Sequence, residues 1–268
     1  MTDVSVIIPT FRRPGQLAEA IESVLSQSVH AEVIVLDDSP EGSARGVVER
    51  YGDSGVTYHQ HVPPTGGKPA VVRNAGWQLA RGRFVHFLDD DDRVADGFYR
   101  EAIATFDARP DIGMLFGRIE PYGDITPESL RHEQSHFSVA ARRARIAARM
   151  RSRYWLVASL LFQPTMLVNS ACMIRRECIA PLGGYDVTLG MNEDVDFYCR
   201  AARRYGYAFL DRTVLHYRIN ADSLMHGRSD DSEIHRSYRS MYERYKATHG
   251  SAEFIAVKLL ARTLLRAT

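Results

Sequence analysis

Four consecutive aspartates, Asp89 to Asp92, are the residues whose type and spacing most directly suggest chemistry in this sequence. Adjacent carboxylates repel one another and raise each other's pKa unless a cation lies among them. If the preceding strand continues to Asp91, its two-residue period places Asp89 and Asp91 on one side, where both could face the same ion or ligand. Because oxygen ligands suit Mg²⁺ or Mn²⁺, the run predicts a divalent-metal site. The alternative is a solvated acidic loop that caps the helix expected near Gly97.

A second acidic pair, Glu193 and Asp194, follows Asn192 at the predicted start of a helix. The positive end of the helix dipole favours ionised acids, so we expect Asp194 to remain ionised rather than protonated. The alternative is that both acids only cap the helix.

Two common nucleotide-binding motifs are absent. The Gly66-Gly67-Lys68 segment resembles part of a P-loop, but Val62 stands where the first glycine belongs and Pro69 where Ser or Thr should bind magnesium. No GxGxxG segment follows the first apolar run. Phosphates would therefore need a metal at Asp91 together with Arg73, whose planar guanidinium suits phosphate oxygens. The alternative places Arg73 on an exposed helix surface.

Short apolar runs alternate with amphipathic stretches over the first 120 residues, which is typical of a sheet flanked by helices. The predicted strands are Val4–Ile8, Val33–Leu36, Val56–His61, Phe84–Leu88 and Ile112–Phe116. The predicted helices begin at Pro14, span Pro69–Ala80 and span Gly97–Arg109, and proline suits the first turn of a helix. This succession predicts an α/β fold with a mostly parallel sheet and right-handed crossovers.

Polar residues follow three of these predicted strands. Ile8 leads into Pro9 and Thr10, Leu36 into Asp37 and Asp38, and Leu88 into the aspartate run. Since ligands of such sheets bind at the carboxyl ends of the strands, we expect these three ends to share one crevice.

The alternation ends after residue 120. Residues 121–165 contain no clear strand, and their arginines predict either a helix that covers the site or the solvated face of a surface helix. These arginines are Arg142, Arg143, Arg145, Arg149, Arg151 and Arg153. Further strands are predicted at Ser170–Arg175 and Thr213–Arg218, and further helices at 230–248 and 252–267.

The composition is that of a folded protein and excludes several classes. With 45% hydrophobic and 25% charged residues, disorder, collagen-like and coiled-coil structures are excluded. The formal charge of +1 argues against nucleic acid as the main partner. Three cysteines without CxxC spacing indicate neither a disulfide framework nor a zinc site. The acidic start MTDVSVIIPT and the lack of a long apolar run predict a cytoplasmic protein, either soluble or peripheral at the inner face of the membrane.

The predicted last helix, within residues 252–268, has an apolar face beside a row of cations. The apolar face comprises Phe254, Val257, Leu260, Ala261, Leu264 and Leu265, and the cations are Lys258, Arg262 and Arg266. This face could pack onto the rest of the chain or a second copy, or contact an anionic membrane. We favour packing.

The order of the motifs resembles that of family 2 glycosyltransferases, which have the GT-A fold. The matching segments are VSVIIPTFRRP, VIVLDDSPEGS, GGKPAVVRNAGWQLARGRFVHFLDDDD, GGYD and NEDVDFYCRAARRYG, within residues 3–118 and 168–218. The resemblance implies an enzyme that transfers a sugar from a nucleoside diphosphate, usually UDP, to an acceptor hydroxyl with inversion at the anomeric carbon. It implies a GT-A domain over 1–218, with a nucleotide-binding half (1–118) and an acceptor half (119–218), and a helical extension at 219–268.

The resemblance also implies a role for individual residues. Asp38 would contact the base, Arg73 the base or pyrophosphate, and Asp194 would be the catalytic base. Asp91 would bind Mn²⁺ or Mg²⁺, and Asp89 would face the metal or the ribose. The remaining nucleotide-side residues are Pro9, Thr10, Arg12, Arg13 and Asp90, and those on the acceptor or sugar side are Glu193, Gly184 and Asn169. The implied partners are a nucleotide-sugar donor and a carbohydrate, lipid-linked or small-molecule acceptor.

One departure from the family pattern concerns the metal site. Many members have Tyr-Arg-x-His, whereas here Tyr217-Arg218-Ile219 precedes Asn220, so His216, His226 or water would have to complete the metal ligands. Two other functions stay open: a metal-dependent phosphohydrolase that uses the aspartates, and a catalytically silent module that binds nucleotide sugars.

Overall fold

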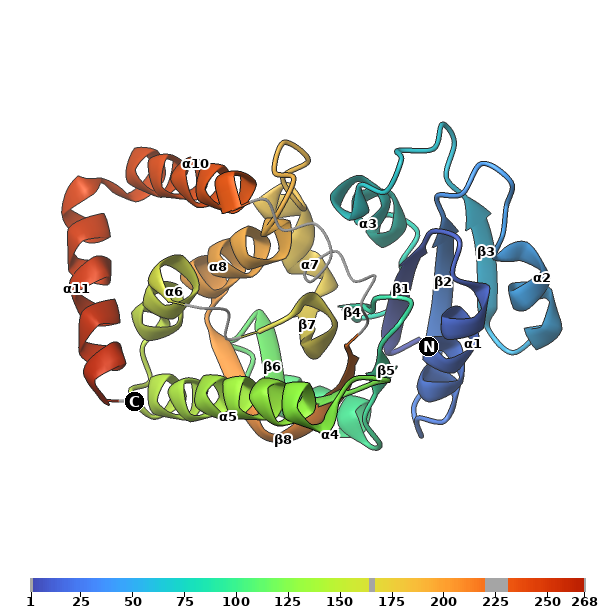
Figure 1. The fold of residues 1–268 in the computed structure, drawn as a ribbon, viewed down its shortest axis with the longest axis horizontal. Coiled ribbons are helices and arrows are strands. Elements are labelled where there is room, and N and C mark those ends of the chain that lie inside the picture. The colour runs from blue at the N-terminus through green and yellow to red at the C-terminus, as the bar shows by residue number, and fades with distance from the viewer. Residues whose placement is uncertain (1, 164–166, 220–230, 268) are drawn as a thin grey trace.

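The apolar runs of the chain become strands of one sheet with the order β3-β2-β1-β4-β7-β6-β8-β5 (Figure 1). The computed structural model describes residues 2–163, 167–219 and 231–267. Its strands are β1 (Val4–Thr10), β2 (Ala31–Asp37), β3 (Val56–Gln60), β4 (Phe84–Phe87), β5 (Arg93–Val94), β6 (Met114–Tyr122), β7 (Cys172–Arg175) and β8 (Tyr207–Arg218).

The first four strands form the parallel half of the sheet that the sequence predicts. β1 pairs in parallel with β2 and β4, and β2 pairs in parallel with β3. β7 then runs antiparallel to both β4 and β6, while β6 and β8 are parallel. Helices lie against both faces, so the predicted α/β class is confirmed.

Proline marks the start of three helices, as its fixed φ and missing N–H favour. The longer helices are α1 (Pro14–Leu25), α3 (Pro69–Trp77), α4 (Phe98–Ala108), α5 (Pro127–Arg149), α6 (Arg153–Phe162), α8 (Glu193–Tyr205), α10 (Asp231–His249) and α11 (Ser251–Ala267). The shorter ones are α2 (Arg45–Val48), α7 (Arg176–Ile179) and 3₁₀ turns at Glu49–Tyr51, Asn169–Ala171 and Ala180–Leu182.

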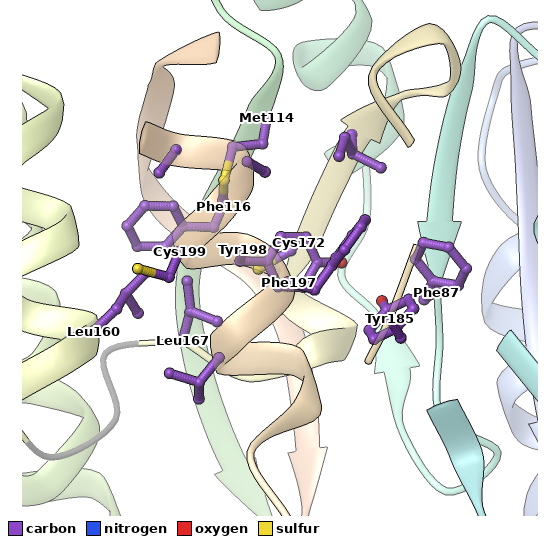
Figure 2. Close-up of a cluster of buried hydrophobic side chains, with 14 of the residues drawn as sticks. Phe87, Met114, Phe116, Leu160, Leu167, Cys172, Tyr185, Phe197, Tyr198 and Cys199 are labelled. Atoms are coloured by element: carbon purple, nitrogen blue, oxygen red, sulfur yellow. The ribbon is translucent and has the colours of Figure 1, made fainter. Parts of the chain in front are cut away.

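The core has two parts, one on each face of the sheet. One contains apolar residues of α1 and α4, and the other joins α3, α6, α8 and α11 to the sheet. Figure 2 shows the centre of the second part, where Tyr185 stacks on Phe197 with ring centroids 4.3 Å apart and meets Phe87 edge-on. Tyr185 of this cluster lies under the guanidinium of Arg73, which donates to Asp89 and Glu193.

The strand that leads into the aspartates is shorter than the sequence predicts. β4 ends at Phe87, and residues 89–92 form a turn in which the Asp92 amide donates to the Asp89 carbonyl at 3.2 Å. A strand that continues to Asp91, the condition under which Asp89 and Asp91 would lie on one side, is therefore not formed. The cause is the Asp89 amide, which leaves the strand ladder to donate to the Ser170 hydroxyl.

Other element boundaries also differ from the prediction. β6 begins at Met114 and continues to Tyr122, and β8 begins at Tyr207 instead of Thr213. These two strands extend each other's ladder, with register shifts on both sides of Arg118. Such shifts mark a β-bulge, which interrupts the alternation of apolar and polar residues from which strands are predicted. β5 has two residues and gives no sequence signal.

The arginine-rich segment is a surface helix. α5 packs against the sheet through small and aromatic residues, namely Phe137, Ala140, Ala144 and Ala147. Arg142 and Arg149 are exposed, and Arg145 forms a two-bonded ion pair with Asp211 on β8. The interpretation as a surface-helix face is thus confirmed for these residues.

α11 packs onto α6, which confirms the packing that we favour from the sequence. Phe254, Val257 and Ala261 are buried, and the Gln163 amide donates to the Ala261 carbonyl at 2.7 Å. The side chains of Leu264, Leu265 and Arg266 lie outside the described part.

None of the described helices combines the length and the hydrophobicity that crossing a bilayer requires.

Candidate functional site

The aspartates 89–92, here called the acid turn, join β4 to β5 and are held by three distant elements. The Ser170 hydroxyl accepts from the Asp89 amide at 3.0 Å. The Thr10 hydroxyl, at the end of β1, donates to the Asp90 carboxylate at 2.7 Å. The Arg218 amide, at the end of β8, donates to the Asp92 carboxylate at 3.0 Å. The turn is therefore fixed from several sides.

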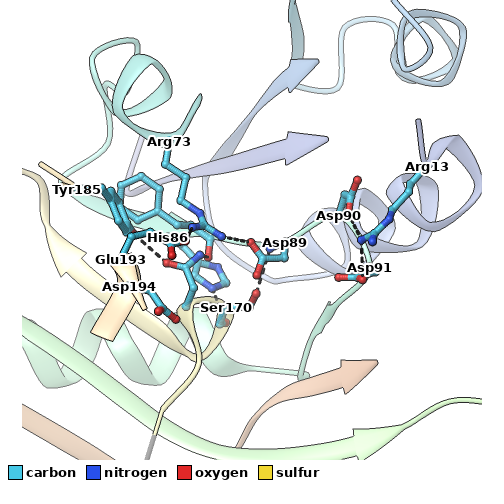
Figure 3. Close-up of polar contacts among 12 residues, drawn as sticks. Arg13, Arg73, His86, Asp89, Asp90, Asp91, Ser170, Tyr185, Glu193 and Asp194 are labelled. Carbon is cyan, nitrogen blue, oxygen red and sulfur yellow. Dashed lines mark hydrogen bonds and ion pairs between the residues drawn. The ribbon is translucent and has the colours of Figure 1, made fainter. Parts of the chain in front are cut away.

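Three arginines contact the acid turn, and Figure 3 shows two of them, Arg13 and Arg73. Arg13 lies 2.8 Å from the Asp91 carboxylate and 3.3 Å from that of Asp90. Arg218 donates from its Nε to the Asp91 carbonyl at 2.9 Å. Arg12 points elsewhere: its φ of 59° turns it toward Glu41, and its side chain is 57% exposed. Of the two arginines after β1, Arg13 is thus the one beside the turn.

Burial and the repulsion between neighbouring carboxylates raise the pKa values of Asp90, Asp91 and Asp92, in the direction that the sequence predicts. Burial raises the pKa of Asp90 to about 7, and the charge of Asp91 adds to this. Burial likewise raises the pKa of Asp91 and, well above its usual range, that of Asp92. The Asp92 Oδ2 atom is buried without a hydrogen-bond partner. A cation or protons would relieve this repulsion.

Arg73 connects the acid turn to the start of α8. Its Nη2 donates to Asp89 at 2.6 Å and its Nη1 to Glu193 at 2.7 Å, and its guanidinium lies over the Tyr185 ring. The side chain is 5% exposed, so the alternative of an exposed helix residue is wrong. The Nε atom is buried and has no hydrogen-bond partner.

Asp194 lies on the first turn of α8, which begins after Asn192 as predicted. Asn192 adopts a left-handed conformation with φ 59°, which turns the chain into the helix. Burial, and next the charge of Glu193, raise the pKa of Asp194 to about 7, while Arg73 acts in the opposite direction. Desolvation therefore opposes the helix dipole, from which we expect an ionised Asp194, and the carboxyl is only partly ionised at pH 7.

Asn169 and Gly184 support the site through contacts with other protein groups. Asn169 is buried, donates to the Phe87 carbonyl at 2.9 Å and accepts from the Tyr185 hydroxyl at 2.8 Å. Gly184 has φ 69°, and a Cβ there would lie 2.4 Å from Asn74 Oδ1, which accepts from the Tyr185 amide. Both residues thereby fix Tyr185 beneath Arg73.

Asp38 organises the loop that contains the two glycines. Its carboxylate accepts from the Thr65 amide and hydroxyl, both at 2.7 Å, and from the Gly67 amide at 2.9 Å. Its own amide donates to the Thr10 carbonyl at 2.9 Å, next to Pro9 in β1. The ends of β1, β2 and β4 are thus linked, as expected from the sequence.

The donor set of the acid turn fits a hard divalent cation. Asp89 and Asp91 offer carboxylate oxygens, and the Asp89 side chain is 34% exposed. Within the described ranges, no cluster of three or more His, Cys, Asp or Glu residues is suited to a metal. Mg²⁺ and similar ions are commonly held by one or two carboxylates, water and substrate phosphates, which is compatible with this arrangement. His216 lies 3.6 Å from Glu120, and Asn220 and His226 fall outside the described residues.

Three supporting residues were not assigned from the sequence: His86, Ser170 and Arg218. His86 donates to the Ser170 carbonyl, and Ser170 and Arg218 hold the acid turn. A histidine inside the apolar run Phe84–Leu88 is an available signal, because a buried polar side chain needs partners. Ser170 gives no comparable signal.

Comparison with characterised proteins places these motifs in a family. Residues 5–179 match the family described as Glycosyl transferase family 2. A poly(ribitol-phosphate) β-N-acetylglucosaminyltransferase, TarP of Staphylococcus aureus, is 34% identical over 48% of this chain and 41% of its own length. A GalNAc(5)-diNAcBac-PP-undecaprenol β-1,3-glucosyltransferase of Campylobacter jejuni is 34% identical over 48% of this chain and 42% of its own. The matched part thus spans less than half of either relative.

Solved structures match nearly the whole chain at low identity. S. aureus TarS 1–349 in complex with UDP-GlcNAc has a TM-score of 0.72 and 19% identity, over 98% of this chain and 72% of that one. The mannosyltransferase PcManGT of Pyrobaculum calidifontis, in complex with GDP-Man and Mn²⁺, has a TM-score of 0.57 and 16% identity, over 99% and 74%. These likenesses establish the GT-A fold. Since the family match covers well over half of the sequence, the chain belongs to glycosyl transferase family 2.

Proposed function

We propose that this protein transfers a hexose or N-acetylhexosamine from a UDP-sugar to an acceptor hydroxyl, with inversion at the anomeric carbon. The observation that carries the proposal is the Arg73 bridge, which joins the acid turn to the Glu193-Asp194 pair. The carboxylates that would bind the nucleotide-sugar donor and the carboxylate that would act as the base are thereby adjacent. The UDP-GlcNAc complex of TarS, which shares the fold, supports the choice of donor.

Asp194 acts as the base in this proposal. The acceptor oxygen forms a bond to the anomeric carbon while the bond from that carbon to the diphosphate oxygen breaks, and Asp194 takes the acceptor proton. Attack from the face opposite the leaving group inverts the configuration. A carboxyl with a pKa of about 7 suits this task, because it loses its proton as the pH passes through neutrality and its carboxylate is still basic enough to accept the acceptor proton.

The diphosphate is bound by two arginines and, through a divalent cation, by two carboxylates of the acid turn. Asp89 and Asp91 would hold Mn²⁺ or Mg²⁺, which supplies positive charge for the leaving diphosphate when bound. Arg13 and Arg73 add fixed positive charge on either side of the turn. Thr10 holds Asp90 beside the diphosphate site, and Asp38 acts on the base through the loop 65–67. Arg12 is turned toward Glu41 and would reach the nucleotide only after leaving that ion pair.

We propose that the acceptor is a carbohydrate or a lipid-linked molecule. We also propose that the protein is cytoplasmic and contacts anionic membranes weakly. The undecaprenol-linked name of the C. jejuni relative supports such an acceptor. On α11, Ile255 and Leu259 are 58% and 54% exposed, and the exposed Lys258 and Arg262 lie beside them. In a symmetric dimer through this face the two basic rows would repel, which favours an anionic surface over a second copy.

The test is metal-dependent donor binding followed by product analysis. UDP-GlcNAc and UDP-glucose with Mn²⁺ should raise the melting temperature more than with EDTA, in proportion to ln(1 + [L]/Kd). Asp91→Asn should remove this difference. Asp111→Asn, an exposed acid paired with Arg109 away from the site, is the matched control.

UDP release should depend on the acceptor, and NMR of the product should show an inverted anomeric carbon. Release of phosphate or nucleotide at the same rate without acceptor would favour a phosphohydrolase. Donor binding without turnover against glycan and lipid-linked acceptors would favour a silent module.

A further inference from the structure

His86 is a fully buried polar residue in the middle of β4, three residues before the acid turn. Its neighbours in the strand alternate between the two core clusters, with Val85 and Phe87 on one face and Phe84 on the other. His86 packs edge-on against the rings of Phe98 and Tyr99. An apolar side chain would fill this position without needing hydrogen bonds, so the presence of a buried imidazole needs an explanation.

Both imidazole nitrogens have partners, and those partners fix the proton. Nε2 lies 2.7 Å from the Ser170 carbonyl, which can only accept, so Nε2 carries the hydrogen. Nδ1 lies 2.7 Å from the Tyr99 hydroxyl and therefore accepts from it. Burial lowers the pKa of His86 to about 4, so the ring is neutral at physiological pH. The hydrogen bonds thus run in one direction, from Tyr99 through His86 to Ser170.

Ser170 passes this constraint to the acid turn. While His86 holds its carbonyl, its hydroxyl accepts from the Asp89 amide at 3.0 Å (Figure 3). This bond takes the Asp89 amide out of the sheet and starts the turn. The adjacent Asn169 holds the Phe87 carbonyl at 2.9 Å, so the 3₁₀ turn Asn169–Ala171 clamps the chain on both sides of Leu88.

We propose that His86 is a positioning residue for donor binding: by holding Ser170 it fixes the backbone of Asp89 and aims its carboxylate. The proposal rests on the proposed function, in which Asp89 binds the donor complex. A histidine that only filled the core would need no link to Asp89. Here a single residue, Ser170, links His86 to Asp89. Arg73 donates to the Asp89 carboxylate at 2.6 Å and holds the side chain of Asp89.

The experiment separates positioning from packing by a readout that needs no ligand. Hydrogen–deuterium exchange of the free protein, followed in peptides that cover residues 88–92, reports on the Asp89 amide. The variants are His86→Phe, Ser170→Ala, their double mutant and His86→Gln, whose amide can both donate and accept. Val85→Ala is the matched control, because Val85 is a buried neighbour on the opposite face of β4.

His86→Phe and Ser170→Ala should each speed exchange in this peptide by about tenfold through local opening. The double mutant should match the single mutants within about twofold, since both changes break the same path. His86→Gln should restore much of the protection. Val85→Ala should lower the melting temperature and leave the peptide protected. The affinity for UDP with Mn²⁺ should fall in the same variants that lose protection, without a change in acceptor KM.

Protection of residues 88–92 in folded His86→Phe, or additive effects of His86→Phe and Ser170→Ala, would overturn the proposal. If His86→Phe does not fold, Tyr99→Phe takes its place, because it removes the hydrogen bond to Nδ1 and keeps the ring. Protection of the peptide in Tyr99→Phe would then count against it. A wild-type protein that fails to bind UDP would contradict the proposed function, whereas the exchange result would still decide the role of His86.

Discussion

Asp89 and Glu193 accept hydrogen bonds from one buried guanidinium, that of Arg73, at 2.6 and 2.7 Å. One acid belongs to the acid turn and the other precedes Asp194. The donor-side and acceptor-side acids therefore share a single counter-charge, and a change on either side alters the electrostatics of the other.

Replacing Arg73 with Met should damage both halves of the site. Two acids would lose their partner, and breaking a buried ion pair typically costs about 3–5 kcal/mol of unfolding free energy. Urea denaturation measures this loss, and turnover at a temperature where the variant is folded measures the catalytic loss. Arg83→Met, which removes a half-exposed pair with Asp107, is the control and should unfold like the wild type. An unchanged urea midpoint for Arg73→Met would contradict the shared counter-charge.

Asp194 should set the acidic limb of the rate profile. Because its pKa is raised from 3.8 to about 7, kcat should rise with pH through about 7 and then level, as the base loses its proton. Asp194→Asn should keep UDP affinity and lose transfer by about 10²–10⁴-fold. Its residual rate should lack this limb, and wild-type turnover in the variant would exclude the assignment.

The same shift has a consequence for stability. A carboxyl whose folded pKa is raised favours the folded state below its unfolded pKa, and this contribution is lost as pH rises through about 7. Asp194→Asn should thus weaken the fall in melting temperature between pH 5 and 8.

Asp92 should tolerate an amide, unlike Asp91. Asp92 Oδ1 accepts from the Arg218 amide, whereas Oδ2 is buried without a partner and the pKa is well above its usual range. The residue is thus favoured in its protonated form, which Asn resembles. Asp92→Asn should retain UDP affinity and melt at or above the wild-type temperature at pH 8, while Asp91→Asn should lose metal-dependent binding. Equal loss in both variants would show that Asp92 carries a necessary charge.

The two faces of α11 should behave differently. Val257 is buried against α6, so Val257→Asp should lower stability by about 3 kcal/mol or more, as buried unpaired charges do. Deleting 252–268 should likewise lower the melting temperature, because it uncovers this core. Ile255→Ser with Leu259→Ser should leave the melting temperature unchanged and reduce sedimentation with anionic liposomes. Unchanged sedimentation would exclude membrane contact through these residues.

The sequence predicts the parts of the site that depend on local pattern. The places of β1, β2 and β4 in the chain follow from apolar runs that lead into polar residues, and the start of α8 follows from Asn192-Glu193-Asp194. Hydrophobic periodicity and helix-start patterns depend only on residues that are close in the sequence, so they can be recognised without the structure.

The rest depends on contacts between distant residues. Ser170 is 81 positions from Asp89, and its hydroxyl ends β4 earlier than the strand pattern predicts. Glu193 is 120 positions from Arg73, and their pairing is what permits Arg73 to be buried. The pKa of Asp194 follows from burial that no local pattern reports.

The position of the acid turn in the chain has a consequence for folding kinetics. Only residues 88–92 separate β4 from β5, yet β7, β6 and β8 lie between these strands in the sheet. Four strand spacings in a flat sheet would be about 19 Å, so the sheet must curl for a tight turn to join them. The turn's contacts with Thr10, Ser170 and Arg218 span 80, 81 and 126 positions, and contacts of such high order form slowly. During refolding, donor binding should therefore appear only in the last phase, after the β1–β4 half has gained its amide protection.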